Sequence, residues 1–170
     1  MEKKKRWITG QRIVCILLTV GLMALVVWFS SQSGGSSNGL SRKIVEMVAG
    51  WFGVSLGPDR MEFWNLVIRK AAHFTLYFWM GVGAAGALLT TQLKKRWQFL
   101  LAVAVCAVFA ASDEMHQWIA DAARHGSAWD VVLDTVGSGC GAGILFGIVF
   151  YQKKLSEKNQ DLKENDNGCS

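Results

Sequence analysis

The sequence predicts an all-α, polytopic membrane protein: a four-helix transmembrane bundle with one additional amphipathic helix at the membrane interface. Hydrophobic residues make up 51% of the 170 residues and charged residues only 18%, below the roughly 25% that is usual in soluble domains. Four segments approach the roughly 20 apolar residues that a membrane-spanning helix needs. Such a high apolar content also excludes a chain that is disordered over most of its length.

The first predicted span, residues 13–29, follows a basic N-terminus, residues 1–12. The span is uncharged and is longer than the roughly 7–15 apolar residues of a signal-peptide core. Trp28 and Phe29 stand just before Ser30, where a cleavage site would require small residues. We therefore expect a retained helix. A soluble bundle is the alternative, but its helices would need charged faces, which this segment lacks.

An amphipathic helix is predicted between the first and second spans. Residues 31–38 are rich in Ser and Gly, a composition that predicts a turn. Apolar residues then recur at spacings of three and four positions: Leu40, Ile44, Val48 and Trp51. An apolar stripe of this kind is typical of a helix that lies in the membrane interface, here on the outer side.

The other three spans are predicted at residues 71–93, 97–112 and 131–151. Asp59 follows a Gly-Pro break and is expected to cap a helix that runs into the second span. The third span is short, and we expect its helix to extend through Ser112 into the polar stretch that follows. These spans complete a predicted transmembrane domain.

The fourth span and the tail differ sharply in composition. The span carries glycines in two overlapping small-xxx-small patterns: Gly137, Gly139, Gly141, Gly143 and Gly147. Small residues let helices approach closely in lipid, and no strand precedes them, so a nucleotide-binding fingerprint is not supported. Residues 152–170 are polar and are expected to form a disordered cytoplasmic tail. The predicted transmembrane domain is therefore residues 13–151.

The distribution of Lys and Arg predicts that both termini lie in the cytoplasm (N-in/C-in). Of the 18 basic residues, twelve fall in the N-terminus, the turn at 94–96 and the tail, whereas six fall on the opposite side. Cytoplasmic loops carry the excess of basic residues in membrane proteins. The net charge of +5 therefore marks orientation, and we expect no nucleic-acid partner.

Polar and ionisable residues gather at the predicted outer ends of the spans. Ionisable groups at membrane depth are costly and usually face a cavity or a partner, so this cluster is the candidate functional site. Helical spacing puts three sets of residues each on one face: Arg69 with His73 and Tyr77, Asp113 with His116 and Gln117, and Asp130 with Asp134. Glu114 points about 100° away from Asp113.

The candidate residues divide into two roles. The acid–base candidates are His73, Asp113, Glu114, His116 and Asp130. The substrate-binding candidates are Gln32, Arg69, Lys70, Tyr77, Gln117, Arg124 and Asp134. Structural interpretations stay open: His73 as a lone interfacial histidine, Asp130 as a helix cap, and Asp134 as an ion-pair partner of Arg69 or Lys70.

Four sequence motifs, in order, resemble those of the VanZ family of small bacterial membrane proteins, known from resistance to the glycopeptide teicoplanin. They are Phe29-Ser30-Ser31-Gln32-Ser33, Arg69-Lys70-Ala71-Ala72-His73-Phe74 with Tyr77-Phe78, Ser112-Asp113-Glu114-Met115-His116-Gln117, and Arg124 with residues 130–137. The chain departs from the family pattern at residues 75–77, where an acidic residue is often found, and at residues 120–123, where a Pro-Gly turn is common. The resemblance implies a role in the bacterial cell envelope.

Two functions of different classes are compatible with these observations. The first is a binding protein, in which Arg69, Lys70 and Arg124 hold phosphate or carboxylate oxygens of a lipid-linked cell-wall precursor or a lipoglycopeptide at the outer leaflet. The second is an intramembrane transferase or hydrolase, with His73 or His116 as the base. A metal site at His73, Asp113, His116 and Asp130 is a weaker variant, and we expect no cofactor and no metal. A transporter is less compatible with so small a bundle.

Overall fold

A computed structural model describes residues 2–31, 34–120 and 128–168, and these residues form five helices with no strand. The helices are α1 (Glu2–Ser31), α2 (Gly34–Trp51), α3 (Pro58–Leu89), α4 (Lys95–Ala120) and α5 (Ala128–Gly168). Four segments are long and apolar enough to cross a membrane: Thr9–Ser30, Pro58–Leu89, Lys95–Ile119 and Ala128–Gln160. The predictions of an all-helical fold and of four spans are confirmed, and the chain is a multi-pass membrane protein.

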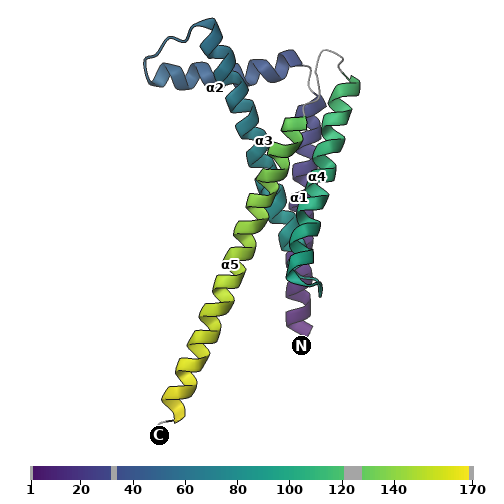
Figure 1. The fold of residues 1–170 in the computed structure, drawn as a ribbon, viewed down its shortest axis with the longest axis vertical. Helices are drawn as coiled ribbons and strands as arrows, with labels where there is room; N and C mark the ends of the chain where they lie inside the picture. Colours follow the sequence, from purple (N-terminus) through teal and green to yellow (C-terminus); the bar gives the residue numbers. More distant parts are fainter. Residues whose placement is uncertain (1, 32–33, 121–127, 169–170) are drawn as a thin grey trace.

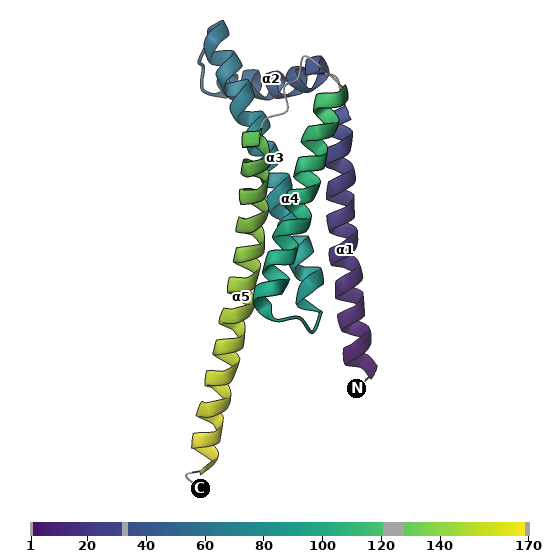
Figure 2. The ribbon, with the colours of Figure 1, turned by 45° about the vertical axis from the view of Figure 1, so that its right-hand side comes forward.

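The four spanning helices run alongside one another, and α2 lies across one end of the bundle (Figure 1). Both chain termini lie at the opposite end, and the view in Figure 2 shows the same arrangement. The outer surface of the bundle is apolar, with exposed side chains such as Leu17, Leu101, Val108 and Ile144. Because soluble monomers rarely expose so much contiguous apolar surface, this surface fits contact with lipid.

The helix boundaries follow from local chemistry. Gly53, just after the end of α2, has a positive φ of 65°, as is common where a helix ends. The Val54 N–H donates to the Ala49 carbonyl at 3.0 Å across this end. Pro58 occupies the first turn of α3, where its missing N–H costs nothing. Asp59 lies inside that turn and makes no capping hydrogen bond, so its predicted role as the cap is wrong. Its carboxylate is nevertheless favourably placed at the positive end of the helix dipole.

The turn between α3 and α4 begins earlier than the sequence suggested. Helix α3 ends at Leu89, four residues before the predicted end of the second span. The hydroxyl groups of Thr90 and Thr91 donate to the carbonyls of Ala87 and Leu88, both at 2.7 Å. These bonds satisfy carbonyls that the helix end leaves unpaired. Helix α4, in contrast, continues past Ser112 to Ala120, as expected.

The closest helix packing is between α3 and α5, and glycines make it possible. A Cβ atom on Gly137 would lie 2.9 Å from the Phe74 carbonyl oxygen, and one on Gly141 would collide with the Phe78 backbone. In the other direction, a Cβ on Gly81 would collide with Ser138. The two helices therefore approach with backbone against backbone, as small residues allow in membrane bundles.

The C-terminal part of α5 differs from the sequence prediction. The tail from residue 152 was expected to be disordered, whereas α5 is helical to Gly168 and extends beyond the rest of the bundle (Figure 1). Good helix formers such as Lys, Glu, Gln and Leu dominate this stretch. An i,i+4 pair between Lys153 and Glu157 at 3.5 Å adds local support.

Candidate functional site

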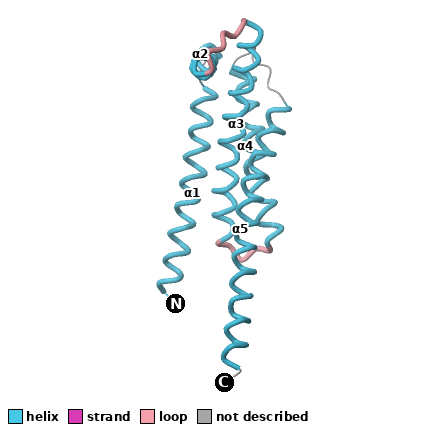
Figure 3. Tube along the Cα trace, turned by 90° about the vertical axis from the view of Figure 1, so that its left-hand side faces the viewer, coloured by secondary structure: helices cyan, strands magenta, loops and turns pink. Residues whose placement is uncertain are grey.

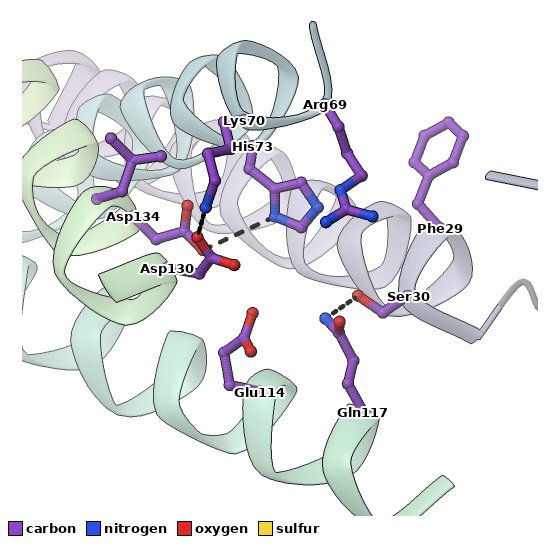
Figure 4. A pocket seen from close by; sticks show the side chains of 10 residues that line it. Phe29, Ser30, Arg69, Lys70, His73, Glu114, Gln117, Asp130 and Asp134 are labelled. Carbon is purple, nitrogen blue, oxygen red and sulfur yellow. Dashed lines mark hydrogen bonds and ion pairs between the residues drawn. The ribbon is translucent and has the colours of Figure 1, made fainter. Parts of the chain in front are cut away.

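A small polar pocket lies at the α2 end of the bundle, where all four spanning helices contribute side chains (Figure 4). It is lined by Phe29, Ser30, Arg69, Lys70, His73, Glu114, Gln117, Asp130, Leu133 and Asp134. Its volume is about 40 Å³. Since one water needs about 10–15 Å³ by this kind of measure, the pocket has room for roughly three waters or one small polar group.

One ion pair joins α3 to α5 at the rim of this pocket. The Lys70 ammonium contacts the Asp130 carboxylate, and the two side chains are 37% and 25% exposed. Asp130 lies in the first turn of α5, where an acid also interacts favourably with the helix dipole. The interpretation of Asp130 as a simple cap is therefore incomplete, because the residue also links two helices.

A second contact between the same helices lies one turn deeper. The Nδ1 atom of His73 lies 3.7 Å from Oδ2 of Asp134, a distance that is too long for a hydrogen bond but within the range of an ion pair. Asp134 is only 2% exposed, and its Oδ1 atom has no hydrogen-bond partner among the described residues. An ion pair of Asp134 with Arg69 or Lys70 was one of the interpretations left open; among the described residues its cationic partner is His73.

A hydrogen-bonded cluster joins α1 to α4 on the other side of the pocket. The Ser30 hydroxyl and the Gln117 amide both donate to Oδ2 of Asp113, each at 2.8 Å. The Gln117 amide also donates to the Ser30 oxygen at 3.0 Å, a contact drawn in Figure 4. Asp113 is buried and does not line the pocket. Its carboxylate holds the two helices that form one wall, rather than facing the cavity.

Arg69 differs from the other described basic residue of the pocket. Its side chain is half-buried and lines the cavity, and no carboxylate lies within 4.0 Å of its guanidinium among the residues that the structure describes. Lys70, in contrast, is paired with Asp130. A guanidinium offers five donors in a planar fork that suits carboxylate and phosphate oxygens. Arg69 is therefore the described donor that is best placed to meet an anionic group.

Tyr77 lies one helical turn beyond His73 on α3, farther from the α2 end of the bundle, and is fully buried. Its ring packs against Phe109 with a centroid distance of 6.2 Å, and its hydroxyl has no hydrogen-bond partner among the described residues. Tyr77 shares the face of α3 that carries Arg69 and His73, as its spacing predicted, but it does not line the cavity. A role in binding would require the cavity to extend toward it.

The placement of His116 contradicts the predicted face of α4. Its side chain is exposed and does not line the pocket. Successive helical residues are rotated by about 100°, so Asp113, Glu114 and Gln117 fall within one arc of about 100°. The structure turns this arc toward the bundle, and His116 lies about 60° beyond Asp113 on the other side. Glu114, one of the acid–base candidates, lies about 100° from Asp113 around the helix and lines the pocket.

The orientation of α4 about its axis also bears on the suggested metal site. His116 was one of four suggested ligands, and it does not face the pocket that His73 and Asp130 share. Within residues 2–31, 34–120 and 128–168, no three His, Cys, Asp or Glu side chains are grouped closely enough to hold a metal ion. The suggested ligand set therefore does not assemble in this structure.

Two predicted binding residues, Gln32 and Arg124, lie outside the described residues. In the opposite direction, the structure adds Phe29, Ser30 and Leu133 to the lining of the pocket. In the sequence, Ser30 stood out only as part of the first family-like motif. Its contact with Asp113, 83 residues away, left no local signal.

A comparison with protein families identifies this architecture. The family model described as VanZ/LLP1 matches residues 15–151, which include all five helices in whole or in part. The chain therefore belongs to the VanZ/LLP1 family, and the resemblance in its motifs is confirmed. No curated protein and no solved structure gave a significant match.

Proposed function

We propose that this member of the VanZ/LLP1 family, a family related to glycopeptide resistance, binds a lipid-linked envelope component or a teicoplanin-type lipoglycopeptide at the outer leaflet of the bacterial cell membrane. The observation that carries the proposal is Arg69. Its guanidinium lines a polar pocket to which all four spanning helices contribute, and no described carboxylate lies within ion-pair distance of it. A phosphate or carboxylate of the ligand supplies the missing anion.

The size of the pocket supports binding of one small group rather than of a whole molecule. A cavity of about 40 Å³ is far below the roughly 300–1,000 Å³ of sites that enclose a drug-sized ligand. The anionic group of the ligand enters the pocket, and the remainder lies against the surface outside it. Helix α2 lies across the same end of the bundle (Figure 1); Trp51 and Phe52 at its end are each 77% exposed and suit contact with a lipid.

The proposed orientation follows from the charge distribution. Both termini and the turn at 94–96 lie at one end of the bundle (Figure 2), and twelve of the 18 basic residues belong to these segments. The positive-inside rule assigns this end to the cytoplasm. The pocket and α2 then lie on the extracytoplasmic side, with α2 in the outer interface, where glycopeptides and cell-wall precursors are accessible.

Substitution of Arg69 tests the proposal. We expect Arg69→Gln to reduce teicoplanin resistance to the level of cells without the protein, and to abolish stoichiometric retention of labelled teicoplanin or lipid-linked precursor by the purified protein. Arg60→Gln is the matched control, because Arg60 is exposed on the same helix and does not line the pocket. Immunoblots of membranes check that the variants are present in equal amounts. Full resistance and full retention in Arg69→Gln would contradict the proposal.

A second candidate function is an intramembrane transferase or hydrolase that acts on an envelope lipid, and the contact between His73 and Asp134 favours it. A buried carboxylate beside Nδ1 of a histidine is the arrangement that orients a general base, and it leaves Nε2 for a substrate. We expect His73→Asn to abolish turnover of a labelled lipid while binding persists. His116→Asn provides the control, since His116 is exposed outside the pocket. Retention of ligand without any turnover by the wild-type protein would decide against the enzyme.

A further inference from the structure

A groove at the other end of the bundle, far from the polar pocket, combines an apolar floor with basic side chains. It lies between the first turn of α4 and the exposed part of α5, and its volume is about 810 Å³, within the range of roughly 300–1,000 Å³ that is usual for ligand sites. Its lining consists of Lys95, Phe146, Gly147, Val149, Phe150, Lys153, Lys154 and Glu157.

The fold explains why this groove is open. Phe99 of α4 and Phe146 of α5 pack edge to face with ring centroids 5.9 Å apart, which anchors the two helices to each other. Below this contact, α5 continues past the turn that joins α3 to α4 (Figure 3). Among the residues that the structure describes, one face of this part of α5 is therefore left without a neighbour, and Phe150 on it is 72% exposed.

Along α5 the groove residues change from apolar to basic, the same order as the acyl chains and the charged headgroup of a phospholipid. Phe146 and Phe150 are followed at helical spacing by Lys153 and Lys154, about 5–12 Å farther along the axis. The aromatic side chains thus face the hydrocarbon layer, and the ammonium groups lie toward the headgroups. Trp97 and Tyr151 are exposed and lie within two residues of Lys95 and Lys153 in the sequence. Trp and Tyr are enriched at the membrane interface.

The charges in the groove favour an anion. Among the described residues, Glu157 is the one acid in its lining, and it pairs with Lys153 at 3.5 Å. Lys95 and Lys154 line the groove without a carboxylate within 4.0 Å among the described residues. The groove therefore holds two ammonium groups, one from each helix, that are available to an anion.

Gly147 is a second, independent indication. A Cβ atom at this position would meet no heavy atom within 4 Å, so close helix packing does not require this glycine, unlike Gly137 and Gly141. The absence of a side chain instead leaves room in the floor of the groove. We propose that the groove is a binding site for one anionic phospholipid, with its phosphate between Lys95 and Lys154 and one acyl chain lying over Gly147 beside Phe150.

Native mass spectrometry of the full-length protein tests this site, with phosphatidylglycerol and phosphatidylcholine as the two probes. We expect the wild-type protein to retain one phosphatidylglycerol in preference to phosphatidylcholine. Replacing Lys95 and Lys154 together by Gln is expected to weaken retention of phosphatidylglycerol by about 30-fold, from the attraction typical of two basic residues near an anionic surface. Equal retention of the two lipids by the wild-type protein would overturn the proposal.

Two matched controls separate a built site from general attraction to basic surfaces. Lys94→Gln combined with Arg96→Gln removes the same number of positive charges from the two positions beside Lys95, but neither residue lines the groove, so retention should persist. Gly147→Leu fills the groove without removing charge and should weaken retention, whereas Gly139→Leu, also at an open position, should not. Equal losses in both charge variants, or unchanged retention in Gly147→Leu, would refute the site.

Discussion

The substitution Gly141→Ala isolates the close contact between α3 and α5. A Cβ atom at this position would lie 2.9 Å from the Phe78 carbonyl carbon and 3.2 Å from Cγ2 of Val82, and closer still to the Phe78 oxygen. Carbon atoms pack at about 3.5–4.0 Å, so the helices must separate by at least about 0.6 Å. Overpacking of this kind costs about 1–3 kcal/mol.

A matched substitution on the same helix reverses the sign of the effect. Gly139→Ala introduces a Cβ that meets no heavy atom within 4 Å, so only the helix propensity changes, in favour of Ala by up to about 1 kcal/mol. The same gain offsets part of the cost at Gly141. We therefore expect Gly141→Ala to lower the free energy of unfolding by about 1–2 kcal/mol, and Gly139→Ala to leave it unchanged or to raise it.

The assay is unfolding of the two purified variants in mixed micelles, with helicity followed by circular dichroism during a titration with a denaturing detergent. Because Lys70 and His73 of α3 contact Asp130 and Asp134 of α5, separation of these helices should also impair the pocket and the ligand binding proposed for it. The reasoning is refuted if Gly139→Ala destabilises the protein as much as Gly141→Ala does, or if Gly141→Ala is as stable as the wild type.

Three further predictions concern the pocket and the orientation. Lys70→Asp and Asp130→Lys should each lower the free energy of unfolding, because each breaks the ion pair between α3 and α5. In a double-mutant cycle of detergent unfolding, the combined variant should regain about 1 kcal/mol relative to the sum of the two single effects. Purely additive effects would argue against the pair. Asp113→Leu leaves two donors without their acceptor and should cost about 2–4 kcal/mol, measured by the same unfolding titration against the isosteric Asp113→Asn. A single cysteine introduced at Trp51 in a variant without native cysteines should react with an impermeant thiol reagent from outside intact cells, and labelling only after lysis would overturn the proposed orientation.

The positions of the spans were predictable because they depend on local composition. Each span is an apolar segment long enough to cross the membrane, and its place in the chain can be found without knowledge of its neighbours. The boundaries were less accurate, since α3 ends at Leu89 through hydrogen bonds of two threonines. The tail was misjudged because composition indicated solubility, whereas the backbone there is helical to Gly168.

The candidate site was only partly predictable. The sequence indicated which helix ends carry polar residues, and seven of the twelve candidates line one pocket: Arg69, Lys70, His73, Glu114, Gln117, Asp130 and Asp134. Helical spacing indicates which residues share a face, but not which face turns inward. The inclusion of Glu114 and the exclusion of His116 follow from a rotation of α4 about its axis that no local pattern encodes.

The sequence by itself determined that this chain is a helical, multi-pass membrane protein of the VanZ/LLP1 family, because hydrophobic length and short motifs are local properties of the chain. Only the tertiary structure decided the pairing of Lys70 with Asp130, the contact of His73 with Asp134, and the absence of a described acid beside Arg69. These contacts depend on how close α3 and α5 approach and on how each helix is rotated. Packing between residues that are distant in the chain sets both quantities, through glycines whose effect depends on the opposing helix.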